Sequence, residues 1–540
     1  MLSTMSDLPL SISQLLTYGS TVHANAEVVT WTENGPRRRT YAEVGTRCAA
    51  LAHALRGLGI DSDQRVATFM WNNAEHLEAY LAVPAMGAVL HPLNIRLFPK
   101  QLVHIINHAE DRVILVDGTL LSLLSPLLPR LKTVEHVIVT GEIPPDFVTP
   151  DEIRVHSYED LLVGQPTDFP WPQQDERTAA AMCYTSGTTG DPKGVAYSHR
   201  SIWLHSMQVC MSDAANLRQG DRALVIVPQF HVLAWGLPYA AFMIGTSLVM
   251  PDRFLQPAPL AELIAAEQPT FAAAVPTIWQ GLHQYLEQHP QDISMMREVL
   301  IGGAAVPPAL LHAFEDDHRV SVLHAWGMTE TSPLGSVARP PAGISRGEQW
   351  PYRYSQGRFP ASVQARLVDD QGGVLPHDGV AVGELQVRGP WITSSYLGDD
   401  ATDNFDDGWL CTGDVGSITA DGYLTLSDRT KDMIKSGGEW ISSVELENAV
   451  MAHPAVAEAA VIGIPDAKWD ERPLVAVVLR EESAATVADL QQYLVDKVAK
   501  WQLPENWAVV EEVPKTSVGK FDKKRLRADY HEGGLTVSRL

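Results

Sequence analysis

Apolar residues in the first 140 positions of the chain recur with two different spacings. They fall three and four residues apart over residues 41–57 and 74–86, which is the spacing of one face of a helix. Short runs rich in apolar residues at 65–70, 113–116 and 136–139 are typical of strands buried in a parallel sheet. Helical and strand patterns that alternate in this way predict a layered α/β fold.

The spacing changes after residue 362. Residues 364–368 and 383–388 alternate apolar with polar side chains, and turns rich in aspartate and glycine separate these segments. Strict alternation is the pattern of half-buried antiparallel strands. We therefore predict a large N-terminal domain over residues 1–428, which combines layered α/β sheets with a small β-barrel-like part.

Polar residues interrupt the pattern at residues 428–432 and predict a domain boundary there. We place the boundary at residues 429–433 and a smaller α+β domain over residues 434–540. The elements expected in the small domain are helices at residues 443–452 and 487–497 and strands at residues 456–464 and 474–479.

The most apolar stretch, residues 223–250, contains Pro228, Gln229, His231 and Pro238. These residues favour a buried strand, loop and helix over a membrane span. Residues 1–10 lack the basic start and long apolar core of a signal peptide. The four cysteines are scattered without a Cys-x-x-Cys pair, which suits a reducing compartment. We therefore expect a cytoplasmic protein without a transmembrane segment.

Composition narrows the choice of ligands. The 540 residues include 41 Lys and Arg against 65 Asp and Glu, a formal net charge of −24. An acidic surface argues against a nucleic-acid partner, because the phosphate backbone repels it. Anionic small molecules must then be held by local amides, lysines and metal ions, since the overall field opposes them.

Residues 184–194 form a glycine-rich segment between two apolar runs, so we expect a loop between two strands. It contains three glycines, four Ser or Thr hydroxyls and Lys193. Glycines let backbone N–H groups approach an anion, while hydroxyls and a lysine add donors and charge. No Gly-Lys-Ser/Thr triplet follows, and Pro192 stands where a helix would begin, which excludes the Walker pattern. The segment predicts a different kind of polyphosphate loop.

Six motifs, in this order, resemble those of the adenylate-forming superfamily of acyl-CoA synthetases, peptide-synthetase adenylation domains and luciferases. Taken singly, all but the first are weak signals. They are the loop at residues 184–194, Trp-Gly-x-Thr-Glu at 326–330, Thr-Gly-Asp at 412–414, Asp-Arg-x-Lys-Asp at 428–432, Ser-Gly-Gly-Glu-Trp at 436–440 and Gly-Lys at 519–520. The N-terminal α/β segment also fits, so the resemblance covers nearly the whole chain.

The resemblance implies that ATP, Mg²⁺ and CoA bind the protein. It implies catalytic roles for Lys520, Thr185, Glu330 and His231, and metal contacts for Thr185 and Glu330. Mg²⁺ prefers one or two carboxylates plus phosphate oxygens, so a carboxylate beside a phosphate loop suits it. The implied ATP-binding residues are Thr185, Ser186, Gly187, Thr188, Thr189, Gly190, Lys193, Gly303, Ala304, Ala325, Trp326, Gly327, Met328, Thr329, Asp414, Arg429 and Lys520.

The same resemblance implies that residues 429–433 form a hinge. The small domain would then be mobile, swing about Lys431 and present a CoA-binding loop. The implied CoA-binding residues are Lys435, Ser436, Gly437, Gly438, Glu439 and Trp440. Two glycines there leave room for the thin pantetheine chain. Relatives often form homodimers, but nothing in this sequence specifies an oligomeric state.

Residues 228–239 resemble the acyl-pocket segment of medium- and long-chain fatty acid–CoA ligases and of methylmercaptopropionate–CoA ligases. The implied acyl-pocket residues are His231, Trp235, Gly302, Gly303, Trp326 and Pro333. No acidic residue stands among them to pair with an amino group, which counts against an amino acid substrate. For His231, a buried core histidine is an equally good interpretation.

We therefore expect an ATP-dependent acid–CoA ligase that activates a fatty or related apolar carboxylic acid through an acyl adenylate and then transfers the acyl group to CoA. Chain length is open, and a short thioether acid, a medium-chain fatty acid and an aryl acid all fit. One alternative is an adenylate-forming enzyme with an acceptor other than CoA. A second alternative, from a different class, is a non-catalytic nucleotide-binding regulator.

Overall fold

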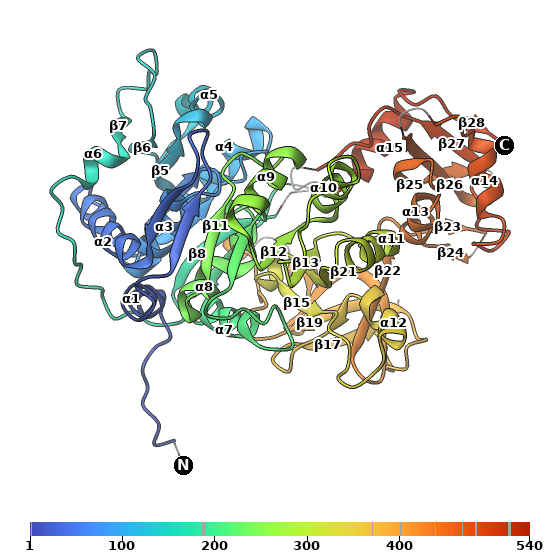
Figure 1. Cartoon of the computed structure of the whole chain (residues 1–540), viewed down its shortest axis with the longest axis horizontal. Helices are drawn as coiled ribbons and strands as arrows, with labels where there is room; N and C mark the ends of the chain where they lie inside the picture. Colours follow the sequence, from blue (N-terminus) through green and yellow to red (C-terminus); the bar gives the residue numbers. More distant parts are fainter. Residues whose placement is uncertain are drawn as a thin grey trace.

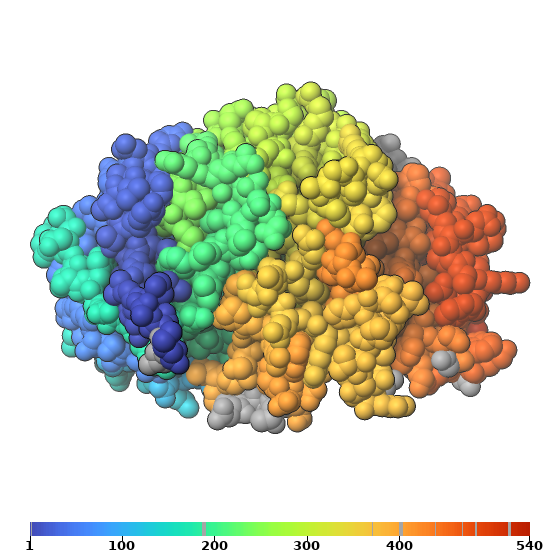
Figure 2. Space-filling model, turned by 90° about the horizontal axis from the view of Figure 1, so that it is seen from below, coloured from blue at the N-terminus to red at the C-terminus, as the bar shows by residue number. Residues whose placement is uncertain are grey.

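The computed structural model describes residues 1, 3–185, 191–369, 371–399, 402–437, 439–466, 468–480, 483–516 and 520–540. Figure 1 shows a large body that contains the N-terminus and a smaller C-terminal part, in red, that contains the C-terminus. The same red part occupies one end of the molecule in the view from below (Figure 2). Three sheets organise the described part of the chain.

The first sheet is formed by β3 to β9, with β8 and β9 at one edge. Its strands are parallel except for the antiparallel pair β8–β9. The order is β7 (Arg154–Ser157), β6 (His136–Thr140), β5 (Asp111–Asp117), β3 (Arg65–Phe69), β4 (Val89–Pro92), β8 (Ala179–Tyr184), β9 (Gly194–Ser198). Strands predicted at residues 65–70, 113–116 and 136–139 are thereby confirmed.

The second sheet has a parallel part and an antiparallel part that are hydrogen-bonded to each other through β14 and β15. The parallel part and its edge hairpin run β14 (Ser321–Gly327), β13 (Glu298–Gly302), β12 (Phe271–Ala274), β10 (Arg222–Val225), β11 (Ser247–Met250), β1 (Glu27–Thr30), β2 (Arg37–Thr40). The antiparallel part runs β15 (Leu334–Val337), β16 (Gly357–Arg358), β22 (Tyr423–Arg429), β21 (Trp409–Ile418), β19 (Gly383–Arg388), β17 (Gln364–Val368), β18 (Val374–Leu375), and β20 (Phe405–Asp406) pairs with β21.

The strands predicted at residues 364–368 and 383–388 are β17 and β19, and they are antiparallel as expected. The segment expected to form a small β-barrel-like part continues by hydrogen bonds into the parallel part of the second sheet. The strand that leaves the parallel part is β14, so residues 326–330 lie where the two parts meet.

Helices pack between and outside these two sheets. One core cluster joins side chains of both sheets to α1 (Ile12–Val22), α2 (Tyr41–Gly57), α3 (Ala74–Ala85), α7 (His199–Cys210) and α8 (Leu237–Ile244). All residues of α3 are buried, because it is surrounded by other elements on every face. A second cluster joins the first sheet to α4 (Pro99–Ala109) and α5 (Leu121–Leu124), and a third joins the second sheet to α9 (Pro257–Glu267), α10 (Pro276–Gln288) and α11 (Pro308–His312). This is the layered α/β arrangement that the sequence predicts.

Residues 223–250 form β10, α8 and β11, as predicted for a buried strand, loop and helix. Among the described residues, no helix combines the length and the apolar character that crossing a bilayer requires.

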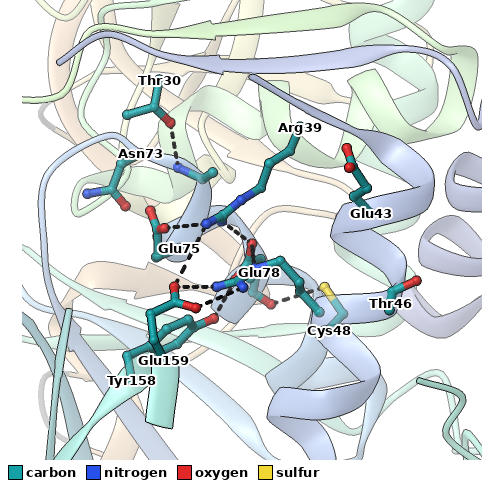
Figure 3. Close-up of polar contacts among 12 residues, drawn as sticks. Thr30, Arg39, Glu43, Thr46, Cys48, Asn73, Glu75, Glu78, Tyr158 and Glu159 are labelled. Carbon is teal, nitrogen blue, oxygen red and sulfur yellow. Dashed lines mark hydrogen bonds and ion pairs between the residues drawn. The ribbon is translucent and has the colours of Figure 1, made fainter. Parts of the chain in front are cut away.

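A buried ionic network attaches the edge strand β2 to α3 (Figure 3). Arg39 of β2 pairs with Glu75 and Glu78 of α3, and Glu78 also accepts a hydrogen bond of 2.6 Å from the Tyr158 hydroxyl. Burial raises the pKa of Glu78, and the positive charges of Arg39 and Arg47 oppose the rise. A buried carboxylate needs such partners, so the network fixes the hairpin β1–β2 against the core.

The small domain has its own sheet and its own core. The sheet order is β24 (Glu439–Ile441), β23 (Ile434–Ser436), β26 (Asp470–Leu479), β27 (Asn506–Val509), β28 (Ser538–Arg539), and β25 (Val456–Asp466) pairs with β26. Its helices are α13 (Ser443–Met451), α14 (Val487–Leu494) and α15 (Lys523–His531). The two helices and two strands predicted here are present, and the helix expected at residues 487–497 ends at Leu494. The small domain is therefore α+β, as predicted.

Candidate active site

The glycine-rich segment connects β8 to β9, as expected for a loop between two strands. Ser186, Gly187, Thr188, Thr189 and Gly190 lie outside the described residues. The two ends of the loop are fixed to each other. The N–H of Thr185 donates to the carbonyl of Lys193 at 2.9 Å, and the N–H of Lys193 donates to the Thr185 hydroxyl at 3.1 Å.

Lys193 and Glu330 both contact one tyrosine, Tyr396. The Lys193 ammonium is 4.9 Å from the centre of the Tyr396 ring and donates to the Asn404 side-chain oxygen at 2.7 Å. The Tyr396 hydroxyl donates to Glu330 Oε1 at 2.7 Å. Burial and the charge of Glu330 raise the pKa of Tyr396. Its hydroxyl therefore stays protonated at physiological pH and can donate this hydrogen bond.

Glu330 is a buried carboxylate whose side-chain partner in the described residues is a neutral hydroxyl. An uncompensated buried charge is costly, so the site favours a cation close by. No group of three or more His, Cys, Asp or Glu side chains in the described residues could cage a metal by itself. One carboxylate, the Thr185 hydroxyl and substrate phosphates are a donor set that Mg²⁺ accepts.

Asp414 is held between two donors. The indole N–H of Trp326 donates to its Oδ2 at 2.7 Å, and Arg429 Nε is 2.7 Å from its Oδ1. Asp414 and Arg429 face each other across β21 and β22. The carboxylate keeps further lone pairs, and a carboxylate is a good acceptor for the two hydroxyls of a ribose.

Lys520 of the small domain reaches the large domain. A Cβ atom added to Gly303 would be 3.6 Å from Lys520 Cε and 3.4 Å from Val275 Cγ1, so the lysine stem passes directly over this glycine. Burial, followed by the charge of Arg429, lowers the pKa of Lys520 to about 8, while Asp414 and Glu330 oppose the change. The Lys520 ammonium therefore interacts electrostatically with Asp414, Arg429 and Glu330.

Trp235 lies over the two glycines that the sequence places in the acyl pocket. A Cβ atom added to Gly302 would be 3.4 Å from the Trp235 ring, and one added to Gly303 would be 4.0 Å from it. Leu233, Ala234 and Trp235 have left-handed backbone angles, with φ of 53°, 48° and 55°. Such angles cost roughly 1–2 kcal/mol per non-glycine residue, and strain of this kind gathers at functional sites.

His231 precedes this left-handed turn. Burial, with the positive charge of Lys520 as the second cause, lowers the pKa of His231 to about 3. The imidazole is therefore neutral at physiological pH and can orient a carboxylate only as a neutral hydrogen-bond donor.

The remaining residues implied in ATP binding lie on β13, β14 and the segments that follow them. Ala325 of β14 is the register partner of Gly302. A Cβ atom on Gly327 would be 1.7 Å from the Pro333 carbonyl, so only glycine fits there. Thr329 is buried, and its carbonyl accepts from the Tyr197 hydroxyl at 2.8 Å. Ala304 follows Gly303 directly, and Met328 is half-buried beside Thr329.

The segment implied in CoA binding is not brought to this site. Lys435 and Ser436 lie on β23, and Glu439 and Trp440 lie on β24. The Gly437 N–H donates to the Trp469 carbonyl at 2.7 Å, and Ser436 accepts from Arg472 at 3.1 Å. The exposed Trp440 ring has Lys435 at 5.9 Å. Where the structure describes this segment, its contacts are within the small domain, and Gly438 lies outside the described residues.

Contacts on both sides of the expected hinge connect the two domains. Asp428 of β22 accepts from the Ser443 N–H at 2.7 Å, at the start of α13. Burial lowers the pKa of Lys431, and its carbonyl accepts from Arg527 at 3.4 Å. Further from the hinge, the Gln280 side chain of α10 donates to the Ala457 carbonyl at 2.9 Å.

Sequence reasoning did not select Tyr396, Asn404, Val275 or Tyr197, although each contacts a selected residue. Tyr396 and Asn404 stand in a stretch with no helical or strand periodicity, so no local pattern marks them. Val275 follows a buried strand, and an apolar residue in that place reads as ordinary core.

Comparisons with known proteins show the family to which the chain belongs. The family model of the AMP-binding enzymes matches residues 19–397, and the model of the AMP-binding enzyme C-terminal domain matches residues 445–520. The chain is 43% identical over 537 residues to the 3-methylmercaptopropionyl-CoA ligase of Ruegeria lacuscaerulensis, covering 98% of this chain and 99% of that protein. It is 44% identical over 536 residues to the long-chain-fatty-acid–CoA ligase of Thermus thermophilus, covering 98% and 97%.

Among solved structures, the chain is similar to the anthranilate CoA ligase AuaEII in complex with anthranoyl-AMP. The TM-score is 0.88 at 27% identity, over 98% of this chain and 100% of that one. With the family model spanning residues 19–397 and relatives above 40% identity over nearly its whole length, the chain belongs to the AMP-binding enzymes of the adenylate-forming superfamily.

Proposed function

We propose that the protein is an ATP-dependent acid–CoA ligase for a fatty or related apolar carboxylic acid. The observation that carries this proposal is the position of Lys520. Its stem crosses Gly303 between the acyl-pocket residue Trp235 and the charged residues Asp414 and Glu330. A lysine in this place stands where a carboxylate and the α-phosphate of ATP would meet.

In the first step, a carboxylate oxygen of the acid attacks the α-phosphorus of ATP. A P–O bond forms to the acid, the bond to the β-phosphate breaks, and pyrophosphate leaves with its electron pair. The Lys520 ammonium stabilises the charge that gathers on the α-phosphate oxygens. Asp414 and Arg429 hold the ribose, while Thr185 and Lys193 hold the leaving phosphates. Mg²⁺, held by Glu330 and Thr185, supplies electrophilic stabilisation of the phosphates when it is bound.

In the second step, the CoA thiolate attacks the carbonyl carbon of the acyl adenylate. A thioester bond forms, the acyl–phosphate bond breaks, and AMP leaves. The Gly437 loop of the small domain must replace Lys520 at the acyl carbonyl, so the domain turns about Lys431 between the steps. An anhydride makes AMP a good leaving group where the free acid offers only a poor one.

The substrate class rests on the pocket candidates and on the relatives. Trp235, Gly302 and Gly303 form an apolar wall without a carboxylate for an amino group. The relatives named above act on 3-methylmercaptopropionate and long-chain fatty acids, so we propose an unbranched, uncharged acyl chain for this protein too.

The test is a pyrophosphate-release screen across straight-chain acids of increasing length and 3-methylmercaptopropionate, each with and without CoA. We expect pyrophosphate with a subset of acids and a thioester with AMP only when CoA is present. AMP without a thioester would favour another acceptor. Absence of pyrophosphate with every acid would favour a nucleotide-binding regulator.

Lys520→Ala tests the assignment of the lysine. We expect it to abolish pyrophosphate release and to leave thioester formation from supplied acyl adenylate within about threefold of wild type, because only the first step needs the ammonium. Lys524→Ala, an exposed neighbour, is the control and keeps both rates. An equal loss of both half-reactions in Lys520→Ala contradicts the assignment.

A further inference from the structure

Tyr396 contacts two oppositely charged side chains of the proposed phosphate and metal region. The face of its ring lies 4.9 Å from the Lys193 ammonium, and its hydroxyl donates to Glu330 at 2.7 Å. The ring is 6% exposed, so the surrounding protein fixes its place. One phenol thus contacts a cation with its face and an anion with its edge.

Within the described residues, the direct side-chain partners of both charges are neutral. The ammonium of Lys193 bonds to the Asn404 amide oxygen and to the aromatic face, and Glu330 bonds to a phenol hydroxyl. Throughout the described residues, no ion pair joins Lys193 to Glu330, although both side chains contact Tyr396. Opposite charges with little solvent between them attract strongly, and a lysine has enough rotamers to close a short gap.

An ion pair between them would harm the proposed reaction. It would take the ammonium away from the phosphates and the carboxylate away from the metal ion, and ATP would have to break it before binding. Keeping both charges on neutral partners avoids that loss, which is the general advantage of a preorganised polar site.

On this basis, and resting on the proposed function, we propose that Tyr396 is a positioning residue that acts as a spacer between Lys193 and Glu330. Its ring keeps the lysine available for the phosphates, and its hydroxyl orients the carboxylate toward the metal position. Asn404 completes the arrangement by holding the lysine on the far side of the ring.

The experiment measures ATP binding without any acid, so that no turnover occurs. Calorimetry is performed with ATP in EDTA and with ATP in excess Mg²⁺. Tyr396→Phe keeps the ring and loses the hydroxyl. We expect its affinity for metal-free ATP to stay within about twofold and its affinity for ATP with Mg²⁺ to fall about fivefold, the loss of one hydrogen bond to a carboxylate.

Tyr396→Leu removes the spacer and allows the ion pair. We expect metal-free ATP to bind about fivefold more weakly, since the lysine must first leave Glu330. Adding Glu330→Gln to Tyr396→Leu removes the competing charge, so the double variant should regain the metal-free affinity of Glu330→Gln alone. A role in packing alone would give no such rescue.

Tyr423→Phe is the matched control, because it removes another buried tyrosine hydroxyl, which donates to the Arg339 carbonyl at 2.7 Å. The proposal is overturned if metal-free ATP binds Tyr396→Leu as tightly as wild type, or if the double variant stays as weak as Tyr396→Leu. These experiments measure ATP binding and need no turnover. Absence of pyrophosphate release with every acid would refute the proposed function, and the binding results for Tyr396 could still be interpreted.

Discussion

At the scale of single residues, the environment of Lys520 sets the chemistry that this group can perform. The side chain lies among Arg429, Asp414, Glu330 and Lys431, and its pKa is lowered from 10.5 to about 8, chiefly by burial. An ammonium is the form that can stabilise a developing phosphate charge, so the useful form is the one present below that pKa.

The first prediction concerns the pH dependence of adenylate formation. Above pH 8 the free enzyme loses the Lys520 proton, so kcat/KM for ATP in pyrophosphate release should fall about tenfold per pH unit. Below pH 8 this group should impose no loss, because it is already charged. Lys520→Arg cannot titrate in this range, and its residual activity should lack the alkaline decline. An equal decline in the arginine variant would assign the effect to another group.

The second prediction concerns Asp414, which receives the Trp326 N–H and the Arg429 guanidinium at 2.7 Å each. Asp414→Ala should weaken ATP binding at least about tenfold, the cost of losing hydrogen bonds to a charged acceptor, and should change the KM of the acid little. Calorimetry with ATP measures this, and Asp421→Ala in an exposed turn is the control. Unchanged ATP affinity would remove Asp414 from the ribose site.

A sequence motif can select residues that lie close together in the chain, but it cannot select a partner that lies far away in the chain. Asp414 and Arg429 each belong to a short motif, and the fold sets them opposite each other on neighbouring strands. Tyr396 and Asn404 stand about 200 residues after Lys193 in a stretch without a pattern, so only the folded chain brings them to that lysine. Spatial proximity of this kind has no signal in a single sequence.

At the scale of elements, the β8–β9 hairpin shows how backbone packing supports the loop between its strands. Tyr184 and Gly194 are register partners at its mouth, and the Tyr184 ring lies against the glycine. The Tyr184 hydroxyl also hydrogen-bonds to His108 of α4 at 2.7 Å. The absence of a side chain at residue 194 lets the ring occupy this place.

The third prediction follows from that contact. A Cβ atom at Gly194 would be 3.0 Å from Tyr184 Cζ and 3.2 Å from Leu397 Cβ. Gly194→Ala should therefore lower the free energy of unfolding by about 1–3 kcal/mol, the usual cost of overpacking. Chemical denaturation measures this. Gly57→Ala is the control, since nothing lies within 4 Å of its added atom and the residue ends helix α2, so stability should not fall.

Element-scale prediction succeeds for helices and strands with clear periodicity. Helix α2 has the bounds that its apolar spacing predicts, and the predicted antiparallel strands are β17 and β19. Sequence patterns could not predict the order of strands in the second sheet. Strand β16 lies between β15 and β22, and more than sixty residues of chain separate β16 from β22. Periodicity predicts which face of a strand is buried, but it does not predict which strand lies next to it.

At the scale of the whole molecule, the proposed reaction makes the relative position of the two domains decide which half-reaction can proceed. The small domain places Lys520 over Gly303, while Gly437 makes its hydrogen bond within the small domain. This is the arrangement that the first step requires. Asp428 and Ser443 connect the domains beside the hinge, where a rotation displaces atoms least.

A contact far from the hinge has to break completely when the small domain turns. Gln280 of α10 makes such a contact, donating at 2.9 Å to the Ala457 carbonyl at the start of β25. It borders a cleft of about 340 Å³ between the domains, which Gln284, one turn further along α10, also lines. Gln284 makes no hydrogen bond to the small domain within the described residues, so the pair offers a matched comparison.

The last prediction is that Gln280→Ala separates the two half-reactions. Losing a hydrogen bond worth about 1 kcal/mol shifts the balance of domain positions about fivefold away from the first-step arrangement. Pyrophosphate release with acid and ATP should fall by up to that factor, and thioester formation from supplied adenylate should hold or rise. Gln284→Ala should leave both rates unchanged. Because a general loss of stability lowers both half-reactions together, a parallel fall in Gln280→Ala would show that this contact does not select the domain position.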